Sequence, residues 1–247
     1  MVKVKKILRI VSCVLSLMLV YAYLCFVFIP KDVSDWGGDK YYHAKGFIGE
    51  PDDSLDIIMF GHSGVYSGFS PVTLYKEYGY TSYASSTASQ PIKKINDLLE
   101  KAVKRQKLKV VFLDVDCLYV RFPLIRYYDS LFAPFVFHAR WKNLKPRDFY
   151  LAPGVRTQDV TKGYKFSAEI SGYQPGEYMG KADAKPAAPK KVHLSGLNRF
   201  VKICRKNDIQ IVFSEFANAT SWSYARHNFI QQYADAHGID FLDMNIP

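Results

Sequence analysis

The sequence contains few cysteines, and their positions exclude a disulfide scaffold and a cysteine-based metal site. Only four of the 247 residues are cysteine. Cys13 and Cys25 fall in a long apolar run, and Cys117 and Cys204 lie in or beside shorter apolar segments. We therefore predict that Cys117 and Cys204 are two buried thiols. Because no cysteines or histidines have metal-ligand spacing, no metal and no cofactor is predicted.

The sequence also lacks internal repeats and any nucleic-acid-binding module, so no nucleic-acid partner is predicted. Its formal net charge is +10, and Lys3, Lys5, Lys6 and Arg9 supply four of these charges. The remaining excess favours attraction to anionic lipid headgroups or acidic wall polymers. A solvated basic surface without a partner is the alternative.

Charged residues are nearly absent from residues 7–29, where Arg9 is the only one. A bilayer core needs about 20 helical residues, so this run predicts a single membrane-spanning anchor. By the positive-inside rule, the preceding lysines leave residues 1–6 in the cytoplasm and the main domain outside the plasma membrane. A cleaved signal peptide is the alternative, but the run exceeds the roughly 7 to 15 apolar residues of such peptides and no Ala-x-Ala site follows.

Beyond this run, apolar strand patterns alternate with helical ones. The strand candidates are residues 55–60, 81–84, 108–115, 209–213 and 239–242. Helical spacing occurs in residues 71–78, 91–104, 194–206 and 223–237. Such alternation predicts an α/β domain, residues 55–247, with a parallel sheet and helices on both of its faces.

Two segments lack this rhythm. Residues 30–54 are rich in glycine, aspartate and aromatic residues, which predicts a juxtamembrane connector that packs loosely on the domain. Residues 118–192 form a long insertion near the carboxyl edge of the sheet, and its lysine- and alanine-rich part, residues 181–191, is expected to be mobile. Insertions of this size are often lids or binding elements.

The most informative short segment reads Phe60-Gly61-His62-Ser63-Gly64 and links the first strand candidate to a helical segment. The carboxyl edge of a parallel sheet is where open α/β folds bind their ligands, so Ser63 is a candidate functional serine. The alternative is an ordinary strand-to-helix turn, in which the glycines supply a permissive backbone and Ser63 hydrogen-bonds locally.

This segment resembles the first block of the SGNH or GDSL hydrolases, in particular their membrane-anchored bacterial members with an extracytoplasmic catalytic domain. Further segments that resemble this family follow in the same order along the chain, at residues 66–71, 83–91, 137–141, 162–166 and 221–228. The resemblance implies a flavodoxin-like three-layer α/β/α sandwich. It also implies that Ser63 is a nucleophile that attacks an ester carbonyl.

The resemblance further implies an oxyanion hole built from backbone N–H groups and an asparagine after the third strand. The candidate oxyanion and pocket residues are Gly64, Ala84, Ser85 and Gln90. No asparagine follows the third strand candidate, which ends in Asp114-Val115-Asp116, so the oxyanion hole is only partly supported. Asp114 and Asp116 form either an acid/base pair or caps for neighbouring N–H groups.

In this family the base histidine and its aspartate come from an Asp-x-x-His motif after the last strand. None of the six histidines has an aspartate three residues before it, and the last strand candidate lies just before Pro247. We therefore expect the domain to be incomplete at its C-terminal end and inactive as given. His62 is assigned no catalytic role, because a residue adjacent to the nucleophile cannot easily fold back to accept its proton.

Two functions remain open. The first is a membrane-anchored esterase or O-acyltransferase that acts on acyl groups of a cell-envelope glycan or polymer through Ser63. The second is a non-catalytic extracytoplasmic binding or scaffold module, whose basic residues 181–191 hold an anionic envelope polymer or a membrane-protein partner. The sequence does not distinguish water from a glycan as the acyl acceptor.

Overall fold

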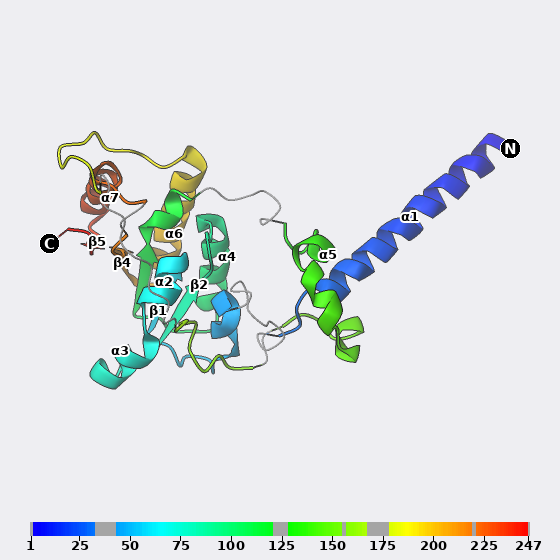
Figure 1. Ribbon diagram of the computed structural model, residues 1–247, viewed down its shortest axis with the longest axis horizontal. Helices are drawn as coiled ribbons and strands as arrows, with labels where there is room; N and C mark the ends of the chain where they lie inside the picture. Colours follow the sequence, from blue (N-terminus) through cyan, green and yellow to red (C-terminus); the bar gives the residue numbers. More distant parts are fainter. Residues whose placement is uncertain are drawn as a thin grey trace. The chain divides into compact units, whose positions relative to one another are not determined.

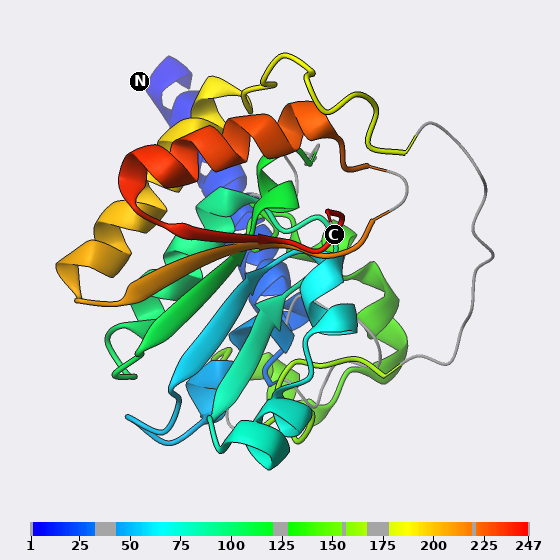
Figure 2. The ribbon, with the colours of Figure 1, turned by 90° about the vertical axis from the view of Figure 1, so that its left-hand side faces the viewer.

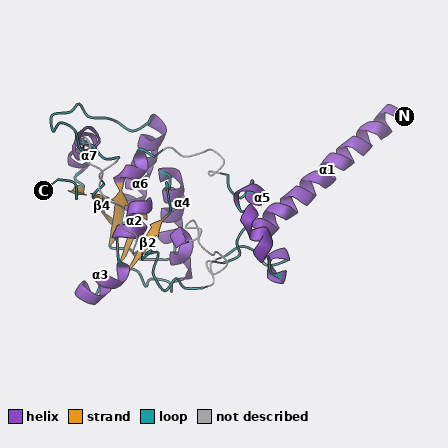
Figure 3. Ribbon diagram, viewed as in Figure 1, coloured by secondary structure: helices purple, strands orange, loops and turns teal. Residues whose placement is uncertain are grey.

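The computed structural model describes residues 2–32, 43–120, 128–154, 157–166, 178–218 and 221–246. The chain divides into two compact units. Figure 1 shows the ribbon, with colours that follow the residue number. Unit 1 comprises Met1–Gly37 and Pro123–Arg156, and unit 2 comprises Gly38–Phe122 and Thr157–Pro247. The helical segments of unit 1 and the sheet of unit 2 are distinguished by colour in Figure 3.

Unit 1 is built around one long helix. Its helical elements are α1 (Val2–Phe28), α5 (Ala133–Val136) and the 3-10 turns η5 (His138–Asn143) and η6 (Pro146–Phe149). The side chains of α1 are exposed from Lys3 to Leu24, and its mean hydropathy reaches 2.4. By length and composition α1 could cross a membrane or act as a signal sequence.

Unit 2 contains a five-stranded sheet in which every strand is parallel to its neighbours. The strands are β1 (Ile57–Gly61), β2 (Ser82–Ser86), β3 (Val110–Asp114), β4 (Gln210–Glu215) and β5 (Asp240–Asp243). Their order is β2-β1-β3-β4-β5, which is the order of flavodoxin-like folds. Each strand overlaps the one predicted from the sequence, so the predicted parallel α/β fold is confirmed.

Most helices of unit 2 cover one face of this sheet. They are η2 (His43–Gly49), α4 (Ile92–Ala102), α6 (Lys191–Lys206) and α7 (Tyr224–His237), and Figure 2 shows α6 and α7 on the same side. Their buried side chains pack with those of the strands into one cluster. In that cluster the ring of Phe60 meets Phe200 edge to face, with centroids 6.3 Å apart. This apolar layer holds the strands in register beneath the polar carboxyl edge.

The opposite face is covered more thinly in the described part of the chain. Two short helices follow β1 there, α2 (Ser63–Gly68) and α3 (Pro71–Tyr78). Val65 of α2 packs on Met59 and Ala84 of the sheet. Residues 157–166 lie against β2, where the Ala84 N–H donates to the Lys162 carbonyl at 2.8 Å. Turns and irregular chain in residues 157–166 thus take part of the place of the expected helical layer on this face.

Two segments differ from the sequence-based expectation. Within the connector, Ala44 and Phe47 are fully buried in the core of unit 2, so its described C-terminal part does not pack loosely. Within the insertion, Pro123–Arg156 groups with α1. The segment expected to be mobile lies along α7, where the Ala187 N–H donates to the Ala225 carbonyl at 2.7 Å. Residues 33–42 of the connector and 121–127, 155–156 and 167–177 of the insertion lie outside the described part.

Replacing Gly163 by alanine should destabilise unit 2 far more than the same change at Gly79. Both residues have positive φ, +83° and +77°, which costs alanine about 1–2 kcal/mol. A Cβ at Gly163 would lie 2.0 Å from the Ala84 carbonyl oxygen, whereas nothing lies within 4 Å of one at Gly79. We expect Gly163→Ala to cost about 1–3 kcal/mol more than Gly79→Ala. Urea unfolding of the full chain in detergent measures both, and equal losses would contradict this close packing.

Candidate active site

Ser63 lies where β1 ends and α2 begins, at the carboxyl edge of the sheet. It is the first residue of α2 and is half-buried, so its hydroxyl remains within reach of a small substrate. The preceding Gly61 permits a close approach of β3, because a Cβ there would lie 2.4 Å from the Cβ of Asp114. The sequence therefore brings the end of β3 and its carboxylates directly beside the Ser63 loop.

His62 bridges Ser63 and Asp116. Its Nδ1 lies 3.2 Å from the Ser63 Oγ, and its Nε2 lies 3.0 Å from the Asp116 Oδ2. The Gly64 N–H lies 3.2 Å from the same Nδ1, so in the neutral ring Nδ1 is an acceptor and the proton is on Nε2. The His62 ring thus folds back to within 3.2 Å of the Ser63 Oγ, contrary to the expectation that an adjacent residue cannot easily do so. As the N-cap of α2, His62 turns its ring back over the first turn of the helix.

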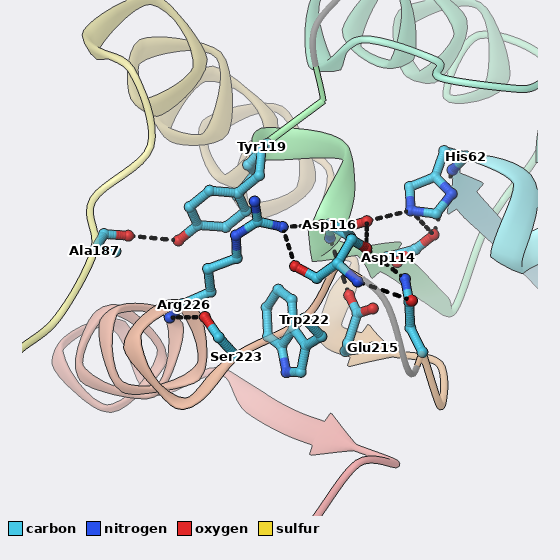
Figure 4. Close-up of polar contacts among 12 residues, drawn as sticks. His62, Asp114, Asp116, Tyr119, Ala187, Glu215, Trp222, Ser223 and Arg226 are labelled. Atoms are coloured by element: carbon cyan, nitrogen blue, oxygen red, sulfur yellow. Dashed lines mark hydrogen bonds and ion pairs between the residues drawn. The ribbon is translucent and has the colours of Figure 1, made fainter. Parts of the chain in front are cut away.

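Asp116 is the carboxylate that orients this histidine, and Figure 4 shows it at the centre of the polar contacts. It lies in the turn η3 (Val115–Leu118) directly after β3. Its other oxygen accepts from Arg226 Nη1 at 2.9 Å, and the Ser221 hydroxyl donates to its Oδ2 at 3.2 Å. Burial raises the pKa of Asp116, but His62 and Arg226 outweigh burial and lower it below the usual aspartate value. Asp116 is therefore ionised.

The surroundings of His62 favour its protonated form. Burial lowers its pKa, but the hydrogen bond with Asp116 and the negative charges of Asp114 and Asp116 raise it above the usual histidine value. The His62 side chain is only 11% exposed, so these charges act through little water. Consequently, a neutral His62 able to accept a proton becomes the main form only at a pH above that usual value.

Two further acidic residues lie near the His62–Asp116 contact. They are Asp114 at the end of β3 and Glu215 at the end of β4. Both are 1% exposed. Burial and the charges of Asp114 and Asp116 raise the pKa of Glu215 to about 11, so it carries a proton at neutral pH. Burial also raises the pKa of Asp114 above the usual aspartate value, although the charge of His62 acts in the opposite direction. One carboxyl proton thus reduces the repulsion within the cluster.

Two further side chains hold Asp116 in place. Glu215 Oε2 accepts the Asp116 backbone N–H at 3.1 Å. The guanidinium of Arg226 lies over the ring of Tyr119, 4.6 Å from its centroid, while it binds Asp116. Arg226 belongs to α7 and Tyr119 follows η3, so these contacts join the ends of β3 and β4 to the helix layer. No pattern in the sequence indicated Arg226 or Glu215 as site residues.

A separate histidine–aspartate pair fixes the end of β5. Asp243 accepts from His227 Nδ1 and from Trp222 Nε1, each at 2.7 Å, and its other oxygen accepts from Asn245. His227 stacks on Phe241 with ring centroids 5.4 Å apart. Because these contacts tie α7 to β5 and to the chain beyond it, this pair has a structural explanation.

The predicted pocket residues have hydrogen-bond partners that the sequence did not indicate. The Gly64 N–H donates to His62 and the Ala84 N–H to Lys162, so both N–H groups have partners within the protein in this conformation. Ser85 Oγ donates to the Ala44 carbonyl at 2.7 Å, and Gln90 Nε2 to the Ser85 carbonyl at 3.1 Å. The described hydrogen bonds of Ala84, Ser85 and Gln90 thus join β2 to neighbouring segments. Ser63 is brought instead to His62 and Asp116.

No described group of three or more His, Cys, Asp or Glu side chains is arranged to hold a metal ion. Cys117 and Cys204 are free and fully buried, as predicted. Burial raises the pKa of the Cys204 thiol to about 12 and that of Cys117 well above its usual value. Both thiols are therefore packing groups of the core at neutral pH.

Comparisons with known proteins show a distant likeness to hydrolase structures. No family model and no curated protein matches the chain. A "putative acylhydrolase" from Bacteroides fragilis matches at 12% identity and a TM-score of 0.36, over 82% of this chain and 74% of its own. A GDSL-like lipase from Bacteroides thetaiotaomicron matches at 11% identity and a TM-score of 0.36, over 83% and 76%. These scores add no argument, so the fold class rests on the strand order and the parallel register.

Replacing Glu215 by glutamine should stabilise the protein and flatten its dependence on pH. Between the usual glutamate pKa of 4.5 and about 11, the unfolded chain releases the Glu215 proton and the folded chain keeps it, so stability falls as pH rises. A neutral amide keeps the contact with Asp116 without this loss. We expect a gain on the order of 1–3 kcal/mol at pH 7.

Denaturant unfolding of the full chain between pH 5 and 9 measures this effect as an unfolding free energy at each pH. The exposed Glu77→Gln on α3 is the matched control and should leave the pH dependence unchanged. A Glu215→Gln chain that is less stable than the original, with the same slope against pH, would show that Glu215 is ionised.

Proposed function

We propose that this protein is a serine esterase or O-acyltransferase in which Ser63 is the nucleophile, His62 the general base and Asp116 the carboxylate that orients the base. The supporting observation is the pair of contacts made by one ring, 3.2 Å from Nδ1 to the Ser63 Oγ and 3.0 Å from Nε2 to Asp116. A base must lie within about 3 Å of the proton-bearing atom, and a partner on its other nitrogen selects the reactive tautomer.

In the proposed reaction, the Ser63 Oγ forms a bond to the ester carbonyl carbon while its proton passes to His62 Nδ1. The carbon–oxygen bond of the ester then breaks, and the leaving alcohol takes the proton from Nδ1. In the second half, water or a sugar hydroxyl attacks the resulting acyl-serine and gives its proton to Nδ1. The bond between the acyl carbon and the Ser63 Oγ then breaks, the Oγ takes the proton from Nδ1, and the carboxylic acid or the acylated sugar leaves. Asp116 stabilises the imidazolium that exists in each half.

The Gly64 N–H couples proton transfer to oxyanion binding in this proposal. Before reaction it donates to His62 Nδ1 at 3.2 Å. Once Nδ1 holds the serine proton it no longer has a lone pair, so the Gly64 N–H loses its acceptor. That N–H then becomes available to the negative oxygen that forms on the substrate at the same moment. Gly64 was predicted as an oxyanion residue, and this sequence of events gives it that role.

The proposal changes the expected activity of the chain. The sequence-based expectation of an inactive enzyme rested on the missing Asp-x-x-His motif. In the proposal, His62 and Asp116 supply the base and its orienting carboxylate from the ends of β1 and β3. The raised pKa of His62 lowers the activity expected near neutral pH, because more of the base is then protonated and cannot accept the Ser63 proton.

We place the enzyme at the plasma membrane, anchored by α1 with its amino terminus in the cytoplasm. The apolar stretch from Lys3 to Phe28 and the lysines at its start support this orientation. A catalytic unit tethered outside the membrane meets acylated glycans or polymers of the cell envelope, which are the substrate class proposed. The exposed lysines of residues 181–191 would attract such polymers where they are anionic.

A second candidate is a non-catalytic binding module for an anionic envelope polymer or a membrane-protein partner. One specific observation favours it, since the backbone N–H groups of Gly64 and Ala84 are both engaged within the protein. The exposed Lys181, Lys185 and Lys190 would then provide the binding surface. Salt-sensitive binding to an anionic wall polymer, lost when these lysines are replaced by glutamine and unaffected by Ser63→Ala, is the expected result for this candidate.

Hydrolysis of a short acyl ester by the full chain in detergent tests the enzyme proposal. Ser63→Ala should abolish turnover, and His62→Gln should lower it about a thousandfold, because the serine loses its base. Ser67→Ala, which replaces an exposed hydroxyl on the same helix α2, is the matched control and should retain full activity. A chain without ester hydrolysis, or with turnover that survives Ser63→Ala, would overturn the proposal.

A further inference from the structure

Large apolar side chains are concentrated on the surface of unit 1 between residues 128 and 150. We call six of them the collar: Tyr128, Leu131, Phe135, Trp141, Phe149 and Tyr150. Their exposed fractions run from 47% for Phe149 to 75% for Tyr150. Soluble surfaces rarely gather so many exposed aromatic residues in so short a segment. An exposed apolar surface of this kind marks a site that a partner molecule covers.

The collar is attached to the last turns of α1. The Tyr21 hydroxyl donates to the Leu131 carbonyl at 2.8 Å, and the Tyr23 hydroxyl donates to the Phe149 carbonyl at 3.1 Å. Behind these bonds, Cys25 packs against Ala133 and Phe137 in a small apolar cluster. Two collar residues thus lie at the level of Tyr21 and Tyr23, beside the apolar helix.

A buried arginine fixes this attachment. Arg140 Nη1 donates to the carbonyls of Val27 and Phe28, at 3.3 and 2.8 Å, and its Nη2 pairs with Asp148 at 2.9 Å. The Arg140 and Asp148 side chains are 8% and 1% exposed. Because the last carbonyls of a helix have no partner within it, Arg140 caps α1 and also complements its dipole. The collar and the end of α1 therefore belong to one packed unit.

The level of the collar corresponds to a membrane interface. A bilayer core takes about 20 helical residues, so a span that starts at Ile7 ends near Phe26. Tyr21 and Tyr23 lie within the last turns of that span, and the collar is bonded to them. Tryptophan and tyrosine prefer the headgroup level, and lysine beside them reaches toward the phosphates. Lys142 lies 5.5 Å from the centre of the Trp141 ring.

We propose that the collar is embedded in the headgroup and upper acyl region of the membrane that α1 spans. The inference rests on the membrane anchoring in the proposed function and is independent of the chemistry of Ser63. Lipid is the partner favoured over protein because the collar is bonded to α1, whose apolar side chains are exposed as far as Leu24. Such interfacial residues would set the depth and tilt of α1 in the bilayer.

The experiment measures the contact of Trp141 with lipid in the full chain, reconstituted into vesicles of zwitterionic and anionic phospholipid. Subtracting the emission of Trp141→Phe from that of the original chain isolates Trp141, and both chains are first floated with the vesicles. Phospholipids brominated near the headgroup should quench roughly half of the isolated emission, since the ring sits at that level. Bromines near the chain ends, and acrylamide in the water, should quench it little.

The control places a tryptophan on an exposed site of unit 2. Tyr78→Trp, made in the Trp141→Phe chain, should be quenched by acrylamide and not by brominated lipid. If the chain floats but Trp141 is quenched by acrylamide alone, the collar is in water and the inference fails while the anchor stands. If neither agent quenches Trp141, the collar is covered by protein, which also overturns a lipid partner. If the chain does not float, anchoring and collar both fail.

Discussion

The hydrogen bond between Asp116 and His62 is the interaction on which the site depends. It joins residues 54 positions apart and turns the imidazole so that its other nitrogen faces Ser63. The bond exists because β1 and β3 are neighbours in the sheet and because Gly61 leaves room for the end of β3. Without Asp116 the ring could present either nitrogen to Ser63, and the raised pKa of His62 would lose its main cause.

Keeping this bond at the sheet edge requires an arrangement of charge around it. Asp114, Asp116 and Glu215 are all buried at the ends of neighbouring strands, and three ionised carboxylates there would repel one another strongly. Arg226 supplies a positive charge to Asp116, and Glu215 keeps a proton. These two groups lower the net negative charge of the cluster, while Asp116 stays ionised beside His62. The fold accepts a stability cost above the usual glutamate pKa to maintain this charge distribution.

The strands and longer helices could be predicted because their signals are local. The apolar run that became β1 is one example, and Ser70, which caps α3, is another. The helix α2 could not, since six residues with two glycines carry no helical pattern. Ser63 could be identified from its position after β1, whereas its contact with His62 depends on how the ring folds back. The pair Asp114-x-Asp116 was the only signal of the carboxylates, and nothing local indicates that residues 128–150 return to α1.

Covalent labelling of Ser63 by a fluorophosphonate in the full chain tests the central claim most directly, because it reports nucleophilicity without any assumption about the substrate. Mass spectrometry should find the phosphonyl group on Ser63. The labelling rate should rise with pH through a value above the usual histidine pKa of about 6.5 and lose this rise in His62→Gln. An unlabelled Ser63, or a His62→Gln chain with the same rate and the same pH dependence, would contradict the account.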